Sequence, residues 1–265
     1  MAVRNDPHVL VVAGSDSSGG AGIARDIETL AAFGLRTCVA VTAVTVQTND
    51  ELRAIQPVSA DLVAAQMRAA FDGNLLAAIK IGMLGTKEVV EAVASVLKDH
   101  PSVPAVLDPV LAASSGRALA DDKAVAILKH TVLPLCCVVT PNLPELAVLA
   151  GTQEAVDELD ILEQAGVLLD AGAPAVLAKG GHAAGDKSVD LLLRPGLPPL
   201  RFAAPRLNAK MRGTGCSLSS ALAAKLALGA PLDEAARDAK MHVLRQLHRH
   251  VSGSWAFEHQ TIPQC

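Results

Sequence analysis

At 265 residues, with 51% hydrophobic residues and a formal net charge of −4, the chain is long enough to bury one large core and carries no basic excess. This balance argues against nucleic acid as a partner, and no apolar run reaches the roughly 18 residues that a membrane-spanning helix needs. Five cysteines without CxxC spacing predict reduced thiols in a cytoplasm. Alternating strand and helix patterns predict a single α/β domain over residues 1–265.

The first predicted unit is a strand, a glycine-rich loop and a helix. The unbroken apolar run His8–Ala13 is typical of a buried parallel strand, and Gly14–Gly22 leads into a helix from about Ala21 to Phe33. Open α/β sheets bind ligands at such loops, although this loop matches neither the dinucleotide nor the Walker pattern. Asp26 lies in the first turns of the helix. It has two readings, compensation of the helix dipole or contact with a ligand in the loop.

The next strand, Thr37–Val46, ends at Gln47. An amide at a strand end offers the donor and acceptor that an aminated heterocycle pairs with, or it satisfies an ordinary turn. A short strand over Arg53–Val58 and a helix over Ala60–Phe71 follow. Ala78–Leu84 then predicts another strand and glycine turn, ahead of a helix that runs to about Leu97.

Two carboxylates follow later strands. Asp108 lies at the end of the strand Ala105–Val110, and Glu145 lies six residues after the strand Cys136–Val139. A helix is expected between them, near Asp121–His130. Because the carboxyl ends of parallel strands share one edge of a sheet, both side chains are candidates for a shared Mg²⁺ with ATP phosphates. For Glu145 the alternative is a helix N-terminal charge.

The pattern continues with a helix over Asp157–Ala171 and a strand over Ala175–Ala178 that ends at Lys179, a point charge suited to a phosphate. Ser188–Leu193 and Leu200–Ala203 predict an antiparallel hairpin. The C-terminal helix is expected over about 233–250.

Before that last helix, a second glycine-rich turn opens into an apolar helix expected at about Leu218–Leu228. Gly213 and Gly215 allow a sharp turn, and the unpaired N–H groups of a helix start favour a phosphate or the charge of a phosphoryl group in transfer. Cys216 lies at the rim of this turn. A thiol at a helix N-terminus can have a lowered pKa, so this side chain could act as a base or a nucleophile rather than as core filling. The alternative is that the Gly-x-Gly sequence is only a tight connection into the helix.

Taken in order, these segments resemble the ribokinase-like superfamily, a three-layer αβα sandwich around a mostly parallel sheet, and within it the hydroxymethylpyrimidine and phosphomethylpyrimidine kinases of thiamine biosynthesis. The motifs that carry the resemblance are Gly14–Gly22 with Asp26, Val41–Gln47, Lys80–Leu84, Asp108–Val110, Thr140–Glu145, Lys179–His182 and Gly213–Ser220. Arg212 departs from the family, in which His is common before the Gly-Thr-Gly-Cys motif. It either grips a phosphate or is a surface substitution.

The resemblance implies a role for each matching residue. Gln47, Asp26, Gly14 and Met83 would bind the aminopyrimidine. Asp108 and Glu145 would serve Mg²⁺, while Asn142, Lys179 and Thr214 would serve the nucleotide. Cys216, Gly213, Gly215 and Lys179 would act in the transfer itself, with Cys216 where sugar kinases of the superfamily carry an Asp base.

The implied reaction is ATP-dependent phosphorylation of the pyrimidine's hydroxymethyl oxygen, and then of the resulting monophosphate, by a cytoplasmic homodimer. Two alternatives remain at this point: a pyridoxal or pyridoxine kinase of the same superfamily, and a catalytically silent pyrimidine sensor. Joint retention of Asp108, Glu145, Lys179 and Cys216 speaks against the sensor, because binding alone needs no such set.

Overall fold

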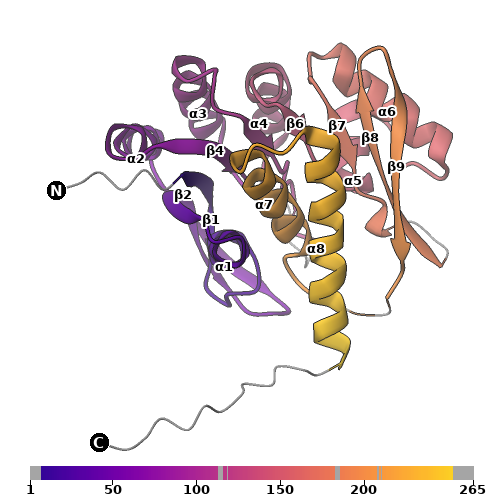
Figure 1. The fold of residues 1–265 in the computed structure, drawn as a ribbon. Helices are drawn as coiled ribbons and strands as arrows, with labels where there is room; N and C mark the ends of the chain where they lie inside the picture. The colour runs from indigo at the N-terminus through magenta and orange to yellow at the C-terminus, as the bar shows by residue number, and fades with distance from the viewer. Residues whose placement is uncertain are drawn as a thin grey trace, which may run out of the picture.

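The computed structural model describes residues 7–112, 116, 117, 119–182, 186–207, 209 and 211–252, which form a nine-stranded sheet between two helical layers (Figure 1). The strand order is β3-β2-β1-β4-β5-β6-β7-β8-β9. The six strands from β2 to β7 in this order pair in parallel. β3 at one edge and the hairpin β8–β9 at the other run antiparallel. The predicted architecture is confirmed.

The strands are β1 (His8–Asp16), β2 (Arg36–Gln47), β3 (Leu52–Pro57), β4 (Leu76–Ile81), β5 (Ala105–Leu107), β6 (Val138–Val139), β7 (Val176–Ala178), β8 (Lys187–Arg194) and β9 (Leu197–Pro205). The helices are α1 (Gly22–Ala32), α2 (Ala60–Gly73), α3 (Lys87–Asp99), α4 (Asp122–Ile127), α5 (Leu143–Ala150), α6 (Glu158–Asp170), α7 (Thr214–Ala227) and α8 (Leu232–Ser252). Most elements therefore lie within a few residues of their predicted positions.

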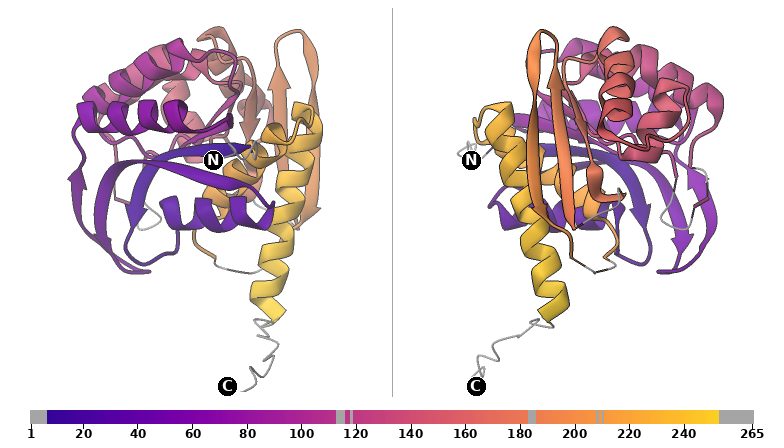
Figure 2. Two further views of the ribbon diagram at one scale, coloured as in Figure 1. Left: turned by 60° about the vertical axis from the view of Figure 1, so that its left-hand side comes forward. Right: turned by 90° about the vertical axis from the view of Figure 1, so that its right-hand side faces the viewer.

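Both faces of the sheet are covered, which explains the unbroken hydrophobicity of its central strands. In β1, Leu10 and Val12 pack into a core beneath α2 to α6, whereas Val9 and Val11 pack beneath α1, α7 and α8. Figure 2 shows the two helical layers on opposite sides of the strands. No helix in the described part of the chain is long and apolar enough to cross a membrane.

Two predicted helix boundaries are wrong. One helix is expected over Asp121–His130. In the structure, α4 ends at Ile127 and is followed by a π-helical turn over Leu128–Val132 and a 3₁₀ turn over Leu133–Leu135. Pro134 lacks the N–H that a continuing helix requires. The helix expected from Leu218 begins four residues earlier, because Gly213 caps it in the left-handed conformation, with φ at 72°.

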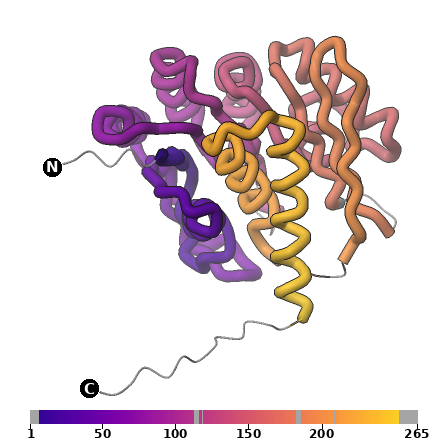
Figure 3. The backbone as a smooth tube through the Cα atoms, viewed as in Figure 1, coloured from indigo at the N-terminus to yellow at the C-terminus, as the bar shows by residue number. Residues whose placement is uncertain are grey.

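The carboxyl ends of β1, β4, β5, β6 and β7 open on one edge of the sheet, since these strands are parallel. The start of α7 lies at the same edge, where a Cβ on Gly215 would lie 3.8 Å from the carboxylate that follows β5. Figure 3 shows that β1, in indigo, lies close to α7, in orange, although these two elements come from opposite ends of the sequence. This edge holds the residues singled out above.

Candidate active site

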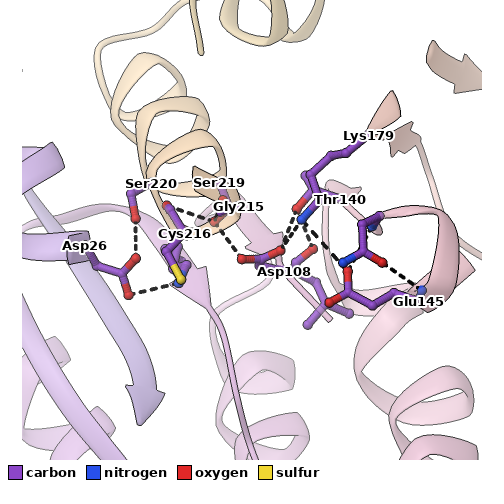
Figure 4. Close-up of polar contacts among 12 residues, drawn as sticks. Asp26, Asp108, Thr140, Glu145, Lys179, Gly215, Cys216, Ser219 and Ser220 are labelled. Atoms are coloured by element: carbon purple, nitrogen blue, oxygen red, sulfur yellow. Dashed lines mark hydrogen bonds and ion pairs between the residues drawn. The ribbon is translucent and has the colours of Figure 1, made fainter. Parts of the chain in front are cut away.

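A buried ion pair lies where the sheet meets α7. Asp108 follows β5 and Lys179 follows β7, and the Nζ of Lys179 donates to Oδ1 of Asp108 at 2.7 Å. Ser219 of α7 donates to the other carboxylate oxygen at 3.2 Å, and Thr140, after β6, donates to Oδ1 at 3.4 Å. Figure 4 shows Asp108 between α7 and Lys179. Three separate segments therefore fix one carboxylate.

Both members of this pair are charged. Burial alone would raise the pKa of Asp108, but the ammonium groups of Lys179 and Lys80 and the bonds from Lys179 and Ser219 hold the pKa below its ordinary value. Burial would likewise lower the pKa of Lys179, and the carboxylates of Asp108 and Glu145 raise it instead. A fixed positive charge thus stands at this edge at neutral pH.

Glu145 and Asn142 form a capping box at the start of α5. The backbone N–H of Asn142 donates to Oε2 of Glu145 at 2.9 Å, and the N–H of Glu145 donates to Oδ1 of Asn142 at 2.8 Å. The helix-terminal reading of Glu145 is therefore confirmed. The same carboxylate also lies 3.9 Å from Nζ of Lys179, so it faces the site as well. Burial raises the pKa of Glu145 to about 7, with Lys179 opposing the rise.

The start of α7 approaches the ion pair closely. A Cβ on Gly215 would lie 3.2 Å from Nζ of Lys179. A Cβ on Gly213 would lie 2.4 Å from the carbonyl oxygen of Gly20, so only glycine fits there. The first helical N–H groups, at Thr214 to Cys216, have no carbonyl of their own helix to bond, and Gly215 among them lies beside Lys179. This arrangement suits the oxygens of a phosphoryl group.

The expected low pKa of Cys216 is wrong. Part of the residue reaches solvent, yet burial of the thiol raises its pKa to about 11. Lys80 lowers the pKa, but the carboxylates of Asp26 and Asp108 oppose that effect. The sequence argument considered only the helix terminus, whereas desolvation and two acidic neighbours outweigh it. The thiol is protonated at neutral pH, and its role in the reaction stays a prediction.

Asp26 points into the protein, where it is fully buried. Its carboxylate bonds Nζ of Lys80 at 2.9 Å and accepts from Ser220 of α7 at 2.8 Å. Neither sequence reading described this ion pair, and contact between Asp26 and a substrate stays a prediction. Lys80 has no role in the sequence analysis, although a lone Lys inside an apolar strand signals a buried partner.

The other residues assigned to the pyrimidine lie around the ends of β1, β2 and β4. A Cβ on Gly14 would lie 2.5 Å from Cε of Met83, so these two residues are in contact. Thr42 holds the backbone of Met83 through a 2.6 Å bond to its carbonyl. Gln47 ends β2, and its backbone N–H donates to Oγ of Ser17 at 2.8 Å. The structure joins Gly14 to Met83 and Gln47 to the first loop.

Asp108 and Glu145 are too few ligands to enclose a divalent cation by themselves. Among the described residues, no group of three His, Cys, Asp or Glu side chains could enclose a metal ion. Asp108 and Glu145 provide two carboxylates, and one ammonium, on Lys179, lies between them. Mg²⁺ commonly takes one or two carboxylates and completes its shell with water and phosphate. The pair suits a cation that arrives with a nucleotide.

Comparison with known proteins adds to this geometry. The family model described as phosphomethylpyrimidine kinase matches residues 16–262. The chain is 43% identical over 246 residues to a hydroxymethylpyrimidine/phosphomethylpyrimidine kinase of Rhizobium meliloti, covering 92% of this chain and 90% of the relative. It is 41% identical to a thiamine biosynthesis bifunctional protein of Geobacter sulfurreducens, over 89% of this chain and 48% of that longer protein.

Among solved structures, the chain is similar to a pyridoxal kinase from Staphylococcus aureus in complex with pyridoxal. The TM-score is 0.84 and the identity 30%, over 92% of this chain and 88% of that one. The fold is therefore shared with a pyridoxal kinase.

Proposed function

The chain belongs to the phosphomethylpyrimidine kinase family, and from this premise we propose that it phosphorylates 4-amino-5-hydroxymethyl-2-methylpyrimidine with ATP, and then its monophosphate, in thiamine diphosphate biosynthesis. Its fold is the ribokinase-like sandwich that the sequence predicts, and the proposal treats residues 1–265 as one kinase domain. The observation that carries the proposal is the meeting of Lys179, Asp108 and the start of α7 at one sheet edge.

In the first transfer, the hydroxymethyl oxygen forms a bond to the γ-phosphorus of ATP while the bond to the β,γ-bridging oxygen breaks and ADP leaves. Little covalent work falls to the protein, because such a transfer depends on position and charge. The ammonium of Lys179 and the N–H groups of Thr214, Gly215 and Cys216 stabilise the charge on the equatorial oxygens. The second transfer uses a phosphate oxygen of the monophosphate as the attacking atom.

The hydroxyl proton needs no strong base in this scheme. The thiol of Cys216 holds its own proton at neutral pH, since burial raises its pKa to about 11. In a loose transition state the attacking oxygen loses its proton late, so the transferred phosphoryl group can accept it. Cys216 then shapes the pocket beside the α7 N–H groups.

Asp108 and Glu145 are the residues that would hold Mg²⁺, directly or through its water shell. Held there, the ion would supply positive charge to offset that of the nucleotide phosphates. Asn142 would lie beside the nucleotide, since it is bridged to Lys179 at the ends of β6 and β7.

The acceptor ring is assigned to the pocket of Gly14, Met83 and Gln47. The amide of Gln47 would pair with the ring nitrogen and the exocyclic amine, and Met83 would give an apolar contact. Asp26 would also line this pocket. Pyridoxal is the second candidate acceptor, because the similar Staphylococcus aureus enzyme is a pyridoxal kinase.

A mass-spectrometric time course with Mg-ATP and hydroxymethylpyrimidine, with pyridoxal as a parallel substrate, tests the proposal. The expected result is a monophosphate that precedes a diphosphate. Phosphorylation of pyridoxal alone would show that the substrate assignment is wrong and that the assignment of the phosphate-binding residues still holds. No product from either substrate would overturn the proposal. Gly213→Ala is the matched inactive control, since its Cβ clashes with Gly20.

We further propose a cytoplasmic homodimer that forms through the outer face of β2. Val44 and Val46 are 50% and 55% exposed there, on the same side of the strand. Free thiols at all four cysteines in the described residues agree with a reducing compartment. Light scattering after size exclusion should give a dimer for the native chain and a monomer for Val46→Asp. A native monomer would overturn this assignment.

A further inference from the structure

Arg212, the departure from the family pattern, contacts two loops that are remote in sequence. Its Nη1 donates to Oγ of Ser18 at 2.7 Å and to the carbonyl of Thr48 at 3.1 Å, and lies 3.4 Å from Oδ1 of Asn49. Its Nη2 donates to Oδ2 of Asp16 at 3.1 Å. One side chain at the start of α7 therefore joins the loop after β1 to the turn after β2. These contacts exceed what a surface substitution would make, and the phosphate grip stays a prediction.

The acceptor on the first loop is itself rigidly held. Oδ1 of Asp16 accepts from the backbone N–H of Ser18 at 2.8 Å and from its hydroxyl at 2.7 Å. Asp16 is only 8% exposed. Burial would raise its pKa, but bonds from Ser18 and the Gln47 side chain, with the charge of Arg212, keep the pKa below its ordinary value. The guanidinium thus meets a fixed, ionised carboxylate.

Gln47 is held from both sides by this arrangement. The hydroxyl of Ser17 donates to the carbonyl of Gln47 at 2.9 Å and accepts from its backbone N–H at 2.8 Å. The residue that follows, Thr48, is bonded to Arg212. The backbone of Gln47 consequently depends on both loops that Arg212 joins.

The two glycine-rich turns also touch directly beneath Arg212. Ala21 and the carbonyl of Gly20 lie against Gly213, where an added Cβ would be 3.2 Å and 2.4 Å from them. An added Cβ on Gly20 would lie 3.2 Å from Nη1 of Arg212. The contact between Gly20 and Gly213 leaves no room for side chains. The guanidinium of Arg212 lies against Gly20, where the two glycine-rich turns meet.

We infer that Arg212 is a positioning residue, which sets the placement of Gln47, at the acceptor end, relative to the N–H groups that begin α7, at the phosphate end. The inference rests on the proposed function for its kinetic consequence, since both ends must meet one substrate. It acts through its bonds to Asp16, Ser18 and Thr48. A misplacement of about 1 Å between such groups can cost on the order of 100-fold in rate.

The kinetic test varies the pyrimidine and ATP separately in Arg212→Met and Asp16→Asn. We expect the KM for the pyrimidine to rise about tenfold or more in Arg212→Met, while the KM for ATP changes less than about threefold. Arg212→Lys should recover only part of the loss, because an ammonium cannot span both loops. The double variant should lose less than the sum of the two single variants, since both changes remove the bond between Arg212 and Asp16.

Arg201→Met is the matched control, because Arg201 also pairs with an acid but is 58% exposed on β9. It should leave all constants unchanged. A loss confined to the phosphorylated acceptor would overturn the inference in favour of a phosphate grip. Unchanged kinetics with a lowered melting temperature would overturn it in favour of a purely structural bond.

A second measurement does not depend on the substrate assignment. Hydrogen exchange of the intact protein should accelerate in Arg212→Met for peptides around residues 45–50 and 213–217 together, with exchange in α3 unchanged. If the native enzyme fails to phosphorylate the pyrimidine yet shows this coupled response, the proposed function fails and the positioning role stands. Exchange that is unchanged in both peptides would overturn the role itself.

Discussion

Two buried Lys–Asp pairs stand at the same edge of the sheet, and they differ in what surrounds them. Lys80 and Asp26 are 2.9 Å apart, with side chains 1% and 0% exposed. Lys179 and Asp108 are 2.7 Å apart, with side chains 11% and 2% exposed. Each pair is bonded by a serine of α7, Ser220 in the first and Ser219 in the second.

The difference lies in the charge around each pair. The Lys80 pair is sealed, and its ammonium bonds the carboxylate of Asp26, although its charge also acts on Asp108. The Lys179 pair shares its ammonium with Glu145 at 3.9 Å, so two carboxylates face one cation, and the start of α7 opens beside it. A closed pair stabilises the arrangement of α1, β4 and α7, whereas the Lys179 pair, with the carboxyl group of Glu145 beside it, suits a further cation and a phosphate. The comparison separates a structural from a functional use of the same chemistry.

The largest effect should come from Lys80→Met. It leaves the carboxylate of Asp26 buried without a counter-charge, which typically destabilises a protein by about 3–5 kcal/mol. Urea denaturation measures the loss. The double variant with Asp26→Asn should recover part of it, and a loss below about 1 kcal/mol would contradict the structural reading of this pair.

Lys179→Met should act mainly on turnover. Removal of one preorganised charge at a transferring group typically lowers kcat by about 10²–10³-fold. The loss of stability should be smaller than in Lys80→Met, because the charge of Lys80 still acts on the buried carboxylate of Asp108. Steady-state kinetics and urea denaturation of the same sample measure both quantities. If this variant lost more stability than Lys80→Met and kept its kcat, the distinction between the pairs would be wrong.

Glu145→Gln should change the pH dependence of stability. Burial raises the pKa of Glu145 to about 7 from 4.5, so the folded state retains a proton that the unfolded chain releases. The stabilisation associated with this proton is complete below pH 4.5 and is lost as pH rises through 7. The urea midpoint of the variant should therefore increase relative to the native protein between pH 5 and 8.

Glu88→Gln offers the matched comparison for that titration, because Glu88 is an exposed acid in the first turn of α3. Its urea midpoint should follow the native protein over the same pH range. A Glu145→Gln curve parallel to the native one would show that Glu145 stays ionised and is fully balanced by Lys179.

The smallest effect is expected for Cys216→Ser. Since burial raises the thiol pKa to about 11, the native enzyme uses no thiolate at neutral pH, and kcat should fall less than about tenfold. Alkylation of Cys216 by iodoacetamide, followed by peptide mass spectrometry, should accelerate steadily from pH 8 to 10. A variant with a 100-fold lower kcat, beside rapid alkylation at pH 7, would restore the thiol as the base.

The sequence predicted what depends on local pattern. Buried strands, glycine-rich turns and the acid after β5 follow from hydrophobic runs and turn residues, and the sheet edge follows from parallel pairing. The partner of Asp26 did not follow, because Lys80 lies 54 residues away. Nor did the contact of Arg212 with Ser18, across 194 residues. The predicted low pKa of Cys216 was wrong for a similar reason, since desolvation depends on all the neighbours of the thiol in space.

The position of α7 and α8 at the end of the chain has a consequence during synthesis. These helices cover the sheet face that includes Val9, Ala78 and Val106. A ribosome adds about 5–20 residues per second, so this apolar face is translated long before its cover emerges. We expect the nascent chain to hold an incomplete, adhesive sheet until residues beyond 239 have left the exit tunnel. Slow translation of the last hundred codons would then favour aggregation. Chaperones that bind the exposed apolar segments of nascent chains would favour recovery of active enzyme.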